Sequence, residues 1–118
     1  VPGRNSQIVI EPLTQRVRVH LAGLILAESR AALIVRKDGQ EDRIYIPRAD
    51  VDLSMTRRSS HFTESTEKGR CTSFDLLDAG ARSKNAAWSY ENPPADLAAL
   101  KEYMTFDPRC VDWLQVES

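Results

Sequence analysis

Residues 16–39 read RVRVHLAGLILAESRAALIVRKDG, and this stretch decides the fold class. Val17, Val19 and Leu21 alternate with charged or polar residues, which is the pattern of a strand with one buried face. Ala22-Gly23 can then turn the chain so that the next apolar residues run back as the second strand of a hairpin. The stretch therefore predicts consecutive antiparallel strands.

The same pattern extends to both sides of this hairpin. Asp38-Gly39 is a strong turn signal after the next apolar run, and Pro47 ends the run that follows. We predict further short strands in this half of the chain at residues 8–10, 24–27, 33–35, 44–46 and 51–53.

Residues 54–70, SMTRRSSHFTESTEKGR, break the pattern. They are rich in Ser and Thr, and Met55 and Phe62 are the only large apolar side chains among them. A polar connection of this length inside a compact domain is uncommon and is often functional or mobile. We therefore predict a long polar loop here, followed by strands over 71–77 and 86–90.

The double proline near the C-terminus predicts a helix. Asn92 can cap a helix that begins with the two prolines after it, where a missing N–H costs nothing. An apolar stripe at helical spacing follows, formed by Leu97, Leu100 and Met104. A further helical turn is predicted at 111–114.

The length and charge of the chain narrow its function classes. With 118 residues, we expect one domain over residues 1–118, made mostly of antiparallel strands with one C-terminal helix. Sixteen basic and seventeen acidic residues give a net charge of −1, so there is no general positive field to attract nucleic acid or anionic lipid. We therefore expect no nucleic-acid partner, while a local charged patch and a homodimer both stay open.

The apolar runs and the cysteines bear on location. No stretch approaches the roughly 20 apolar residues that span a bilayer, so we expect no membrane partner. The first ten residues lack the basic start and apolar segment of a signal peptide. Cys71 and Cys110 are far apart, which suits free thiols in a reducing compartment better than a disulfide. The sequence thus predicts a cytoplasmic protein.

Several common chemistries lack their motifs in this chain. The glycines are scattered singly, so neither of the glycine-rich phosphate loops is present, and no GxSxG elbow or HExxH helix occurs. His20 and His61 have no partner at a spacing that suits a metal site. We therefore predict no metal and no cofactor.

A few residues remain as candidates for chemistry. His61 could act as a general base near neutral pH, or it could be an exposed loop histidine. Cys71, with Lys68 and Arg70 nearby, could be a nucleophile or a buried, inert thiol. Arg57-Arg58-Ser59-Ser60 resembles a kinase site or a small anion patch, or it is merely solvated charge.

The segment NAAWSYENPP, residues 85–94, concentrates aromatic side chains. Trp88 and Tyr90 point to the same side of a regular strand, with Ala86 beneath them. They can form the wall of a ligand site, or a core layer covered by the predicted helix. Asn85 can contribute to such a site or serve only as a turn residue.

Several segments of the chain together resemble one family over nearly the whole length. They are PGRNSQIVIEP, RVRVHLAGLILAESRAALIV, YIPRADVDL, EKG, and NAAWSYENPP with LKEYMTFDP, and the AW-x-Y motif is the most specific. These segments resemble the family called domain of unknown function 427, small single-domain proteins of bacteria and fungi. The resemblance implies a compact, mainly β fold, tent- or barrel-like in outline, and it implies no established reaction.

The chain departs from this family at one motif. Members typically carry Cys-Pro-x-Lys-Gly where this chain has Ser65-Thr66-Glu67-Lys68-Gly69. Lys68 and Gly69 match, but Ser65 replaces the cysteine and Thr66 the proline. This departure puts in doubt any thiol chemistry proposed for the family, and Cys71 is no obvious substitute.

Our first hypothesis is a small-molecule-binding domain with a pocket between the 54–70 loop and the strand of Trp88 and Tyr90. In this pocket Lys68 and Arg48 would meet an anionic group, the two aromatic side chains would pack on the ligand, and polar atoms would be oriented by Asn85 and His61.

Two further hypotheses come from other classes. The chain could be an enzyme acting on a small polar metabolite, a transferase or hydrolase, with His61 or Lys68 as acid or base and Ser65 as nucleophile. It could instead be a protein-interaction module that uses a sheet edge or the exposed face of the strand at 16–20.

Overall fold

The computed structural model describes residues 8–37, 41–65, 69–78, 81–93 and 95–116. Within these ranges, the side chains of residues 37, 61, 63–65, 69, 78, 81–83, 96 and 114–116 are outside the description.

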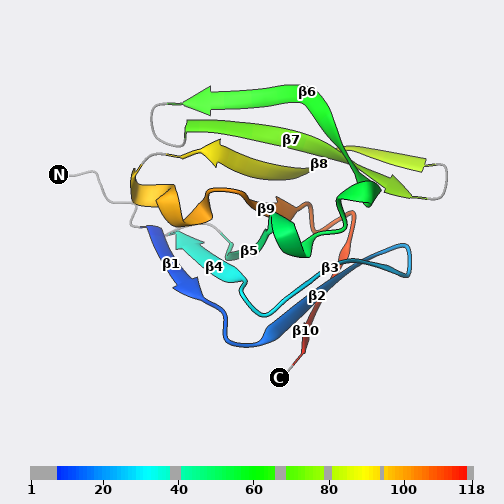
Figure 1. Ribbon diagram of the computed structural model, residues 1–118, viewed down its shortest axis with the longest axis horizontal. Coiled ribbons are helices and arrows are strands. Elements are labelled where there is room, and N and C mark those ends of the chain that lie inside the picture. The colour runs from blue at the N-terminus through cyan, green and yellow to red at the C-terminus, as the bar shows by residue number, and fades with distance from the viewer. Residues whose placement is uncertain (1–7, 38–40, 66–68, 79–80, 94, 117–118) are drawn as a thin grey trace.

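Antiparallel strands dominate the molecule (Figure 1). Within the described residues, ten strands form a seven-stranded sheet in the order β1-β4-β5-β9-β8-β7-β6 and a three-stranded sheet in the order β10-β2-β3. The strands are β1 (Ile8–Pro12), β2 (Arg16–Leu21), β3 (Leu24–Ser29), β4 (Leu33–Lys37), β5 (Arg43–Pro47), β6 (Thr56–Ser65), β7 (Gly69–Asp78), β8 (Ala81–Asn92), β9 (Tyr103–Phe106) and β10 (Asp112–Val116). All of their pairings are antiparallel, so the predicted mainly β, antiparallel fold class is confirmed.

The β2–β3 hairpin forms where the alternating apolar pattern predicts it. Val17, Val19 and Leu21 are buried, and the polar residues between them are partly exposed. Ala22 and Gly23 turn the chain with φ angles of 52° and 84°. Two successive residues with positive φ define a type I′ turn, whose twist matches that of the flanking strands.

Ala22 is strained in this turn, because its Cβ disfavours the left-handed conformation that asparagine tolerates. We expect Ala22→Asn to raise the free energy of unfolding by about 0.5–1 kcal/mol, since Asn-Gly is a preferred type I′ pair. Urea denaturation monitored by circular dichroism would measure this change. An unchanged or lower free energy of unfolding would contradict the assigned turn.

The larger core lies between the two sheets. Both sheets contribute fully buried side chains to it, and among the largest are Val17, Val19, Leu26, Ile46, Leu76, Met104 and Phe106. This shared core is what holds the β2–β3 hairpin against the seven-stranded sheet.

A second, smaller core lies on the opposite face of the seven-stranded sheet. Ile46 points into the first core, so its neighbour Tyr45 in β5 points to the other face. There, Tyr45 and Tyr90 pack beneath Leu97 and Leu100. Both faces of this part of the sheet are therefore covered.

The predicted C-terminal helix is wrong. Residues 95–100 form η3 (Ala95–Leu100), a 3₁₀ segment kinked at Leu97, and the described residues contain no longer helix. Leu97 and Leu100 do cover the second core, but Met104 lies in β9 and faces the first core. The helical spacing misleads because the chain re-enters the sheet at Tyr103, where strand alternation decides the direction of each side chain.

In the described ranges, no helix combines the length and apolar character needed to cross a bilayer.

The loop predicted over 54–70 is also wrong in its described part. Residues 56–65 form β6, which pairs with β7. β6 is an edge strand of the seven-stranded sheet, and an edge strand with exposed polar side chains is a common way to avoid association. A polar sequence is therefore compatible with a strand at this position.

Two shorter predictions fail as well. The helical turn predicted at 111–114 is replaced by β10, which pairs with β2 and places Trp113 against Phe106. The strand predicted at 51–53 is reduced to one bridge between Val51 and Ala27, after which η2 (Leu53–Met55) begins. A third 3₁₀ turn, η1 (Arg48–Asp50), follows β5.

Candidate functional site

Two β-bulges lie at the same level on either side of β7. In β6, residues 59–61 lie opposite Ser73 alone, and in β8, residues 84–86 lie opposite Asp75 alone. Bulges leave residues unpaired and redirect side chains, and they are frequent beside functional sites. The surface between β6 and β8 is therefore the part of the sheet where ladder pairing is most disturbed.

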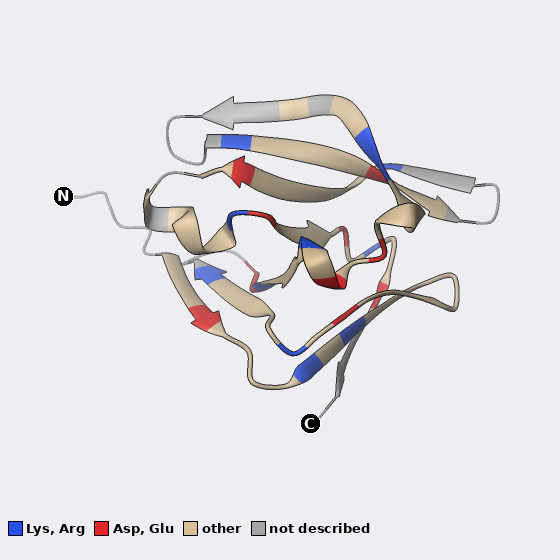
Figure 2. Ribbon diagram, viewed as in Figure 1, with Lys and Arg blue, Asp and Glu red and all other residues tan. Residues whose placement is uncertain are grey.

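A polar hollow of about 400 Å³ lies at these bulges. Its lining residues are Arg57, Arg58, Ser59, Ser60, Asp75, Lys84 and Asn85. Figure 2 shows the corresponding arrangement of charge, with basic segments of β6 and β8 beside an acidic segment of β7. Its volume falls within the usual range for small-molecule sites.

Asp75 fixes the backbone of the β8 bulge. Asp75 is 8% exposed, and one of its carboxylate oxygens accepts a hydrogen bond of 2.9 Å from the backbone N–H of Asn85. Asn85 has a φ of 53°, a left-handed conformation that asparagine adopts more readily than most residues. The bulge is thus held by a buried carboxylate and occupied by a residue type suited to its geometry.

Arg58 is already neutralised by a carboxylate outside the hollow. Its guanidinium donates two hydrogen bonds of 2.9 Å to Glu91, which also accepts from the Thr72 hydroxyl at 2.8 Å. Arg48 donates to the same carboxylate at 3.3 Å. The hydrogen bonds from Arg58, with smaller contributions from Thr72 and the nearby arginines, lower the pKa of Glu91 to about 2. This network ties β6 and η1 to β8.

Arg57 and Lys84 differ from the cations that form ion pairs with carboxylates. Within the described part of the chain, neither side chain has an ion pair or a hydrogen bond, although both line the hollow. In contrast, ion pairs to carboxylates are made by Arg16, Arg18, Arg36, Arg48, Arg58 and Arg109. Asp75 is the one carboxylate among the described lining residues, so the unpaired charge in the hollow is positive.

The two aromatic candidates lie elsewhere on the sheet. Tyr90 is 8% exposed, and its ring stacks on Tyr45 with 6.0 Å between centroids. Burial is the largest cause of the raised pKa of both hydroxyls. Trp88 is partly buried, and the guanidinium of Arg43 lies over its ring at 4.9 Å. Neither Trp88 nor Tyr90 is among the described residues that line the hollow.

The remaining candidates are dispersed along the chain. Arg48 pairs with Glu91 at 3.3 Å and approaches Glu102 at 4.0 Å. His61 belongs to the β6 bulge and Ser65 ends β6, but their side chains are outside the description. Lys68 lies outside the described residues altogether. Of the predicted ligand-binding residues that the structure describes, Asn85 alone lines the hollow, and the roles of the others stay predictions.

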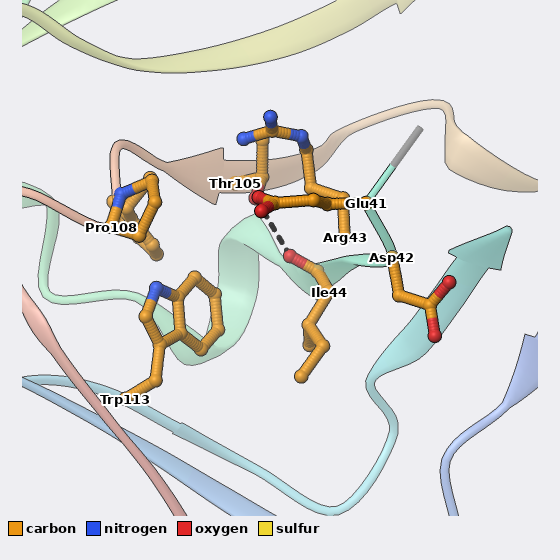
Figure 3. A pocket seen from close by; sticks show the side chains of 8 residues that line it. Glu41, Asp42, Arg43, Ile44, Thr105, Pro108 and Trp113 are labelled. Carbon is orange, nitrogen blue, oxygen red and sulfur yellow. Dashed lines mark hydrogen bonds between the residues drawn. The ribbon is translucent and has the colours of Figure 1, made fainter. Parts of the chain in front are cut away.

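A second pocket, of about 170 Å³, opens between β5, β9 and β10 (Figure 3). Its wall includes Trp113, whose ring lies 5.9 Å from that of Phe106, and Thr105, whose hydroxyl donates to the Ile44 carbonyl at 2.7 Å. Asp42, at its rim, is paired with Arg36 at 3.3 Å. This pocket is smaller than most ligand sites, and part of its polar lining is already paired.

Few features of the sequence predict the hollow. Arg57-Arg58-Ser59-Ser60 was one recognisable pattern, with an anion patch among its interpretations. No sequence pattern marks Asp75 and Lys84 as site residues, because the two bulges that bring them together depend on strand pairing. Among the side chains described, no three His, Cys, Asp or Glu residues are grouped so as to hold a metal ion.

Fold and site together define a mainly β, antiparallel protein with a basic polar hollow on one sheet. The family model for a domain of unknown function, number 427, matches residues 9–117. The chain therefore belongs to the domain of unknown function 427 family, as its sequence segments indicate. No curated protein matches the chain.

Proposed function

We propose that this protein is a small-molecule-binding domain whose ligand places an anionic group in the hollow between β6 and β8. The observation that carries the proposal is the convergence of Arg57 and Lys84, two cations without a described partner, on one hollow. The hydroxyl of Ser60 and the amide of Asn85 add neutral hydrogen-bonding groups to the same wall. An anion would gain both charge and hydrogen bonds there.

Comparison with another hollow of the protein supports this choice. A hollow of about 620 Å³ is lined by Arg16, Glu28, Ser29, Arg30, Ala31 and Asp50. Its arginines are balanced by two carboxylates, and Arg16 is already paired with Glu28 at 3.3 Å. The larger volume therefore carries no surplus of positive charge, whereas the hollow beside β7 does.

Titration with inorganic phosphate, followed by amide NMR spectra, tests the proposal. We expect saturable shifts centred on residues 57–60 and 84–86. Arg57→Gln and Lys84→Ala should each weaken binding about three- to tenfold, because each removes one exposed charge from the anion. Lys101→Ala is the matched control, since Lys101 is exposed, likewise lacks a described ion pair, and lies beside Tyr90.

Two results would contradict the proposal. One is the absence of any saturable response to phosphate in these amides. The other is equal weakening of binding by Lys101→Ala and Lys84→Ala, which would indicate a general effect of net charge. Circular dichroism of each variant would establish that the fold is retained.

We further propose a cytoplasmic location for the protein. Cys71 and Cys110 form no disulfide with each other, which supports a reducing compartment.

A further inference from the structure

The hollow between β6 and β8 has a chemical character beyond its positive charge. We infer that it selects a phosphate monoester with a hydroxyl-bearing body, a sugar or polyol phosphate, over a carboxylate or a nucleotide. This inference rests on the proposed function and names the ligand class of the same site.

The preference for phosphate over carboxylate follows from the number of donors. A guanidinium from Arg57, an ammonium from Lys84 and the hydroxyl of Ser60 approach the hollow from two different strands. A carboxylate has two oxygens in one plane, whereas a phosphate monoester has three acceptor oxygens and a charge of about −1.5 to −2 near pH 7. Donors that arrive from β6 and β8 on opposite sides of β7 can be used together by the tetrahedral group.

The preference for a hydroxyl-bearing body follows from the rest of the lining. The described lining residues include no aromatic and no aliphatic side chain, so a nucleobase would find no stacking surface there. Trp88 does not line the hollow, and its ring is already in contact with the guanidinium of Arg43. The amide oxygen of Asn85 is an acceptor that suits a hydroxyl group of a sugar.

Size and strand geometry agree with a ligand of this kind. The hollow measures about 400 Å³, which is ample for a phosphate group with a short polyol and small for a complete dinucleotide. The two bulges, residues 59–61 of β6 and 84–86 of β8, lie on two sides of it.

Calorimetric titration of the whole chain with four probes tests this inference. The probes are glucose 6-phosphate, inorganic phosphate, gluconate, and adenosine monophosphate. We expect glucose 6-phosphate to bind about tenfold more tightly than gluconate and adenosine monophosphate, and more tightly than inorganic phosphate, because only it uses both parts of the site. Its affinity should also rise between pH 5.5 and 7.5, as the second phosphate ionisation near a pKa of about 6 completes, while that of gluconate stays level.

Each contrary result overturns a defined part of the inference. Equal binding of gluconate would overturn phosphate selectivity, and equal binding of adenosine monophosphate or inorganic phosphate would overturn selection of the polyol body. In these cases anion binding itself, and with it the proposed function, would stand. Absence of binding by all four probes would overturn both.

Two variants separate this site from an unspecific charge effect. Asn85→Asp adds a negative charge in the hollow and keeps a residue type that tolerates the left-handed backbone, so it should weaken glucose 6-phosphate binding without unfolding the protein. Trp88→Phe should leave the affinities for glucose 6-phosphate and adenosine monophosphate unchanged. Loss of adenosine monophosphate binding in Trp88→Phe alone would place the ligand on the aromatic strand and overturn the inference.

Discussion

Replacement of Phe106 with alanine should lower the free energy of unfolding by about 3–5 kcal/mol, the largest effect that we expect from a single change. Phe106 is 1% exposed in the core between the two sheets, and its ring contacts that of Trp113. The alanine would leave a cavity that strands anchored on both sides cannot easily close. Equilibrium denaturation in urea would give the free energy of unfolding.

Phe62 provides the matched control for this prediction. Phe62 is 44% exposed on the edge strand β6, where the guanidinium of Arg70 lies over its ring at 4.0 Å. Phe62→Ala removes the same atoms but little burial, so the loss should stay below about 1 kcal/mol. Similar losses for the two variants would contradict the placement of β9 between β5 and β8.

Replacement of Glu91 with glutamine should have the second largest effect, a loss of about 2 kcal/mol in the free energy of unfolding. Glu91 is 26% exposed and accepts hydrogen bonds from Arg58, Arg48 and Thr72, so the neutral amide would lose two charge-assisted partners. Glu102→Gln is the control, because Glu102 is 66% exposed and only 4.0 Å from Arg48. Glu102→Gln should lower the free energy of unfolding by less than about 1 kcal/mol.

The same carboxylate predicts a pH dependence with a definite sign. Its pKa falls from an ordinary 4.5 to about 2 in the folded protein. Glu91 therefore stabilises the fold fully above pH 4.5, and this contribution is lost as the pH falls through 2. We expect the difference in unfolding free energy between wild type and Glu91→Gln to shrink steadily between pH 5 and pH 2. A difference that stays constant over this range would contradict the network.

Alternating sequence predicted the fold well where one face of a strand is buried and the other is wet. Val17, Val19 and Leu21 show this pattern, and the hairpin turn at Ala22-Gly23 lies where it was expected. The pattern failed for β6, an edge strand whose polar residues resemble a loop. It also failed at Met104, because side-chain spacing along the chain does not reveal where a 3₁₀ turn gives way to a strand.

The candidate site was less accessible from sequence, for a physical reason. Arg57, Asp75 and Lys84 belong to three strands, and their proximity depends on how these strands pair. A bulge is a property of two paired strands, so neither strand alone reveals it. Asn85 was recognised among the candidates, but the left-handed backbone that suits it became evident only with the register of β7 and β8.

The β6 bulge at residues 59–61 also affects how separate copies of the chain associate at high concentration. The edge strand of an open sheet presents unpaired N–H and C=O groups. An extended segment of another chain can pair with these groups and start a fibril. Because three residues of β6 face one residue of β7 here, a straight ladder cannot continue along this edge, and the charge of Arg57 repels the same edge of a second copy. The bulge that borders the hollow thus also disfavours polymerisation through the sheet edge.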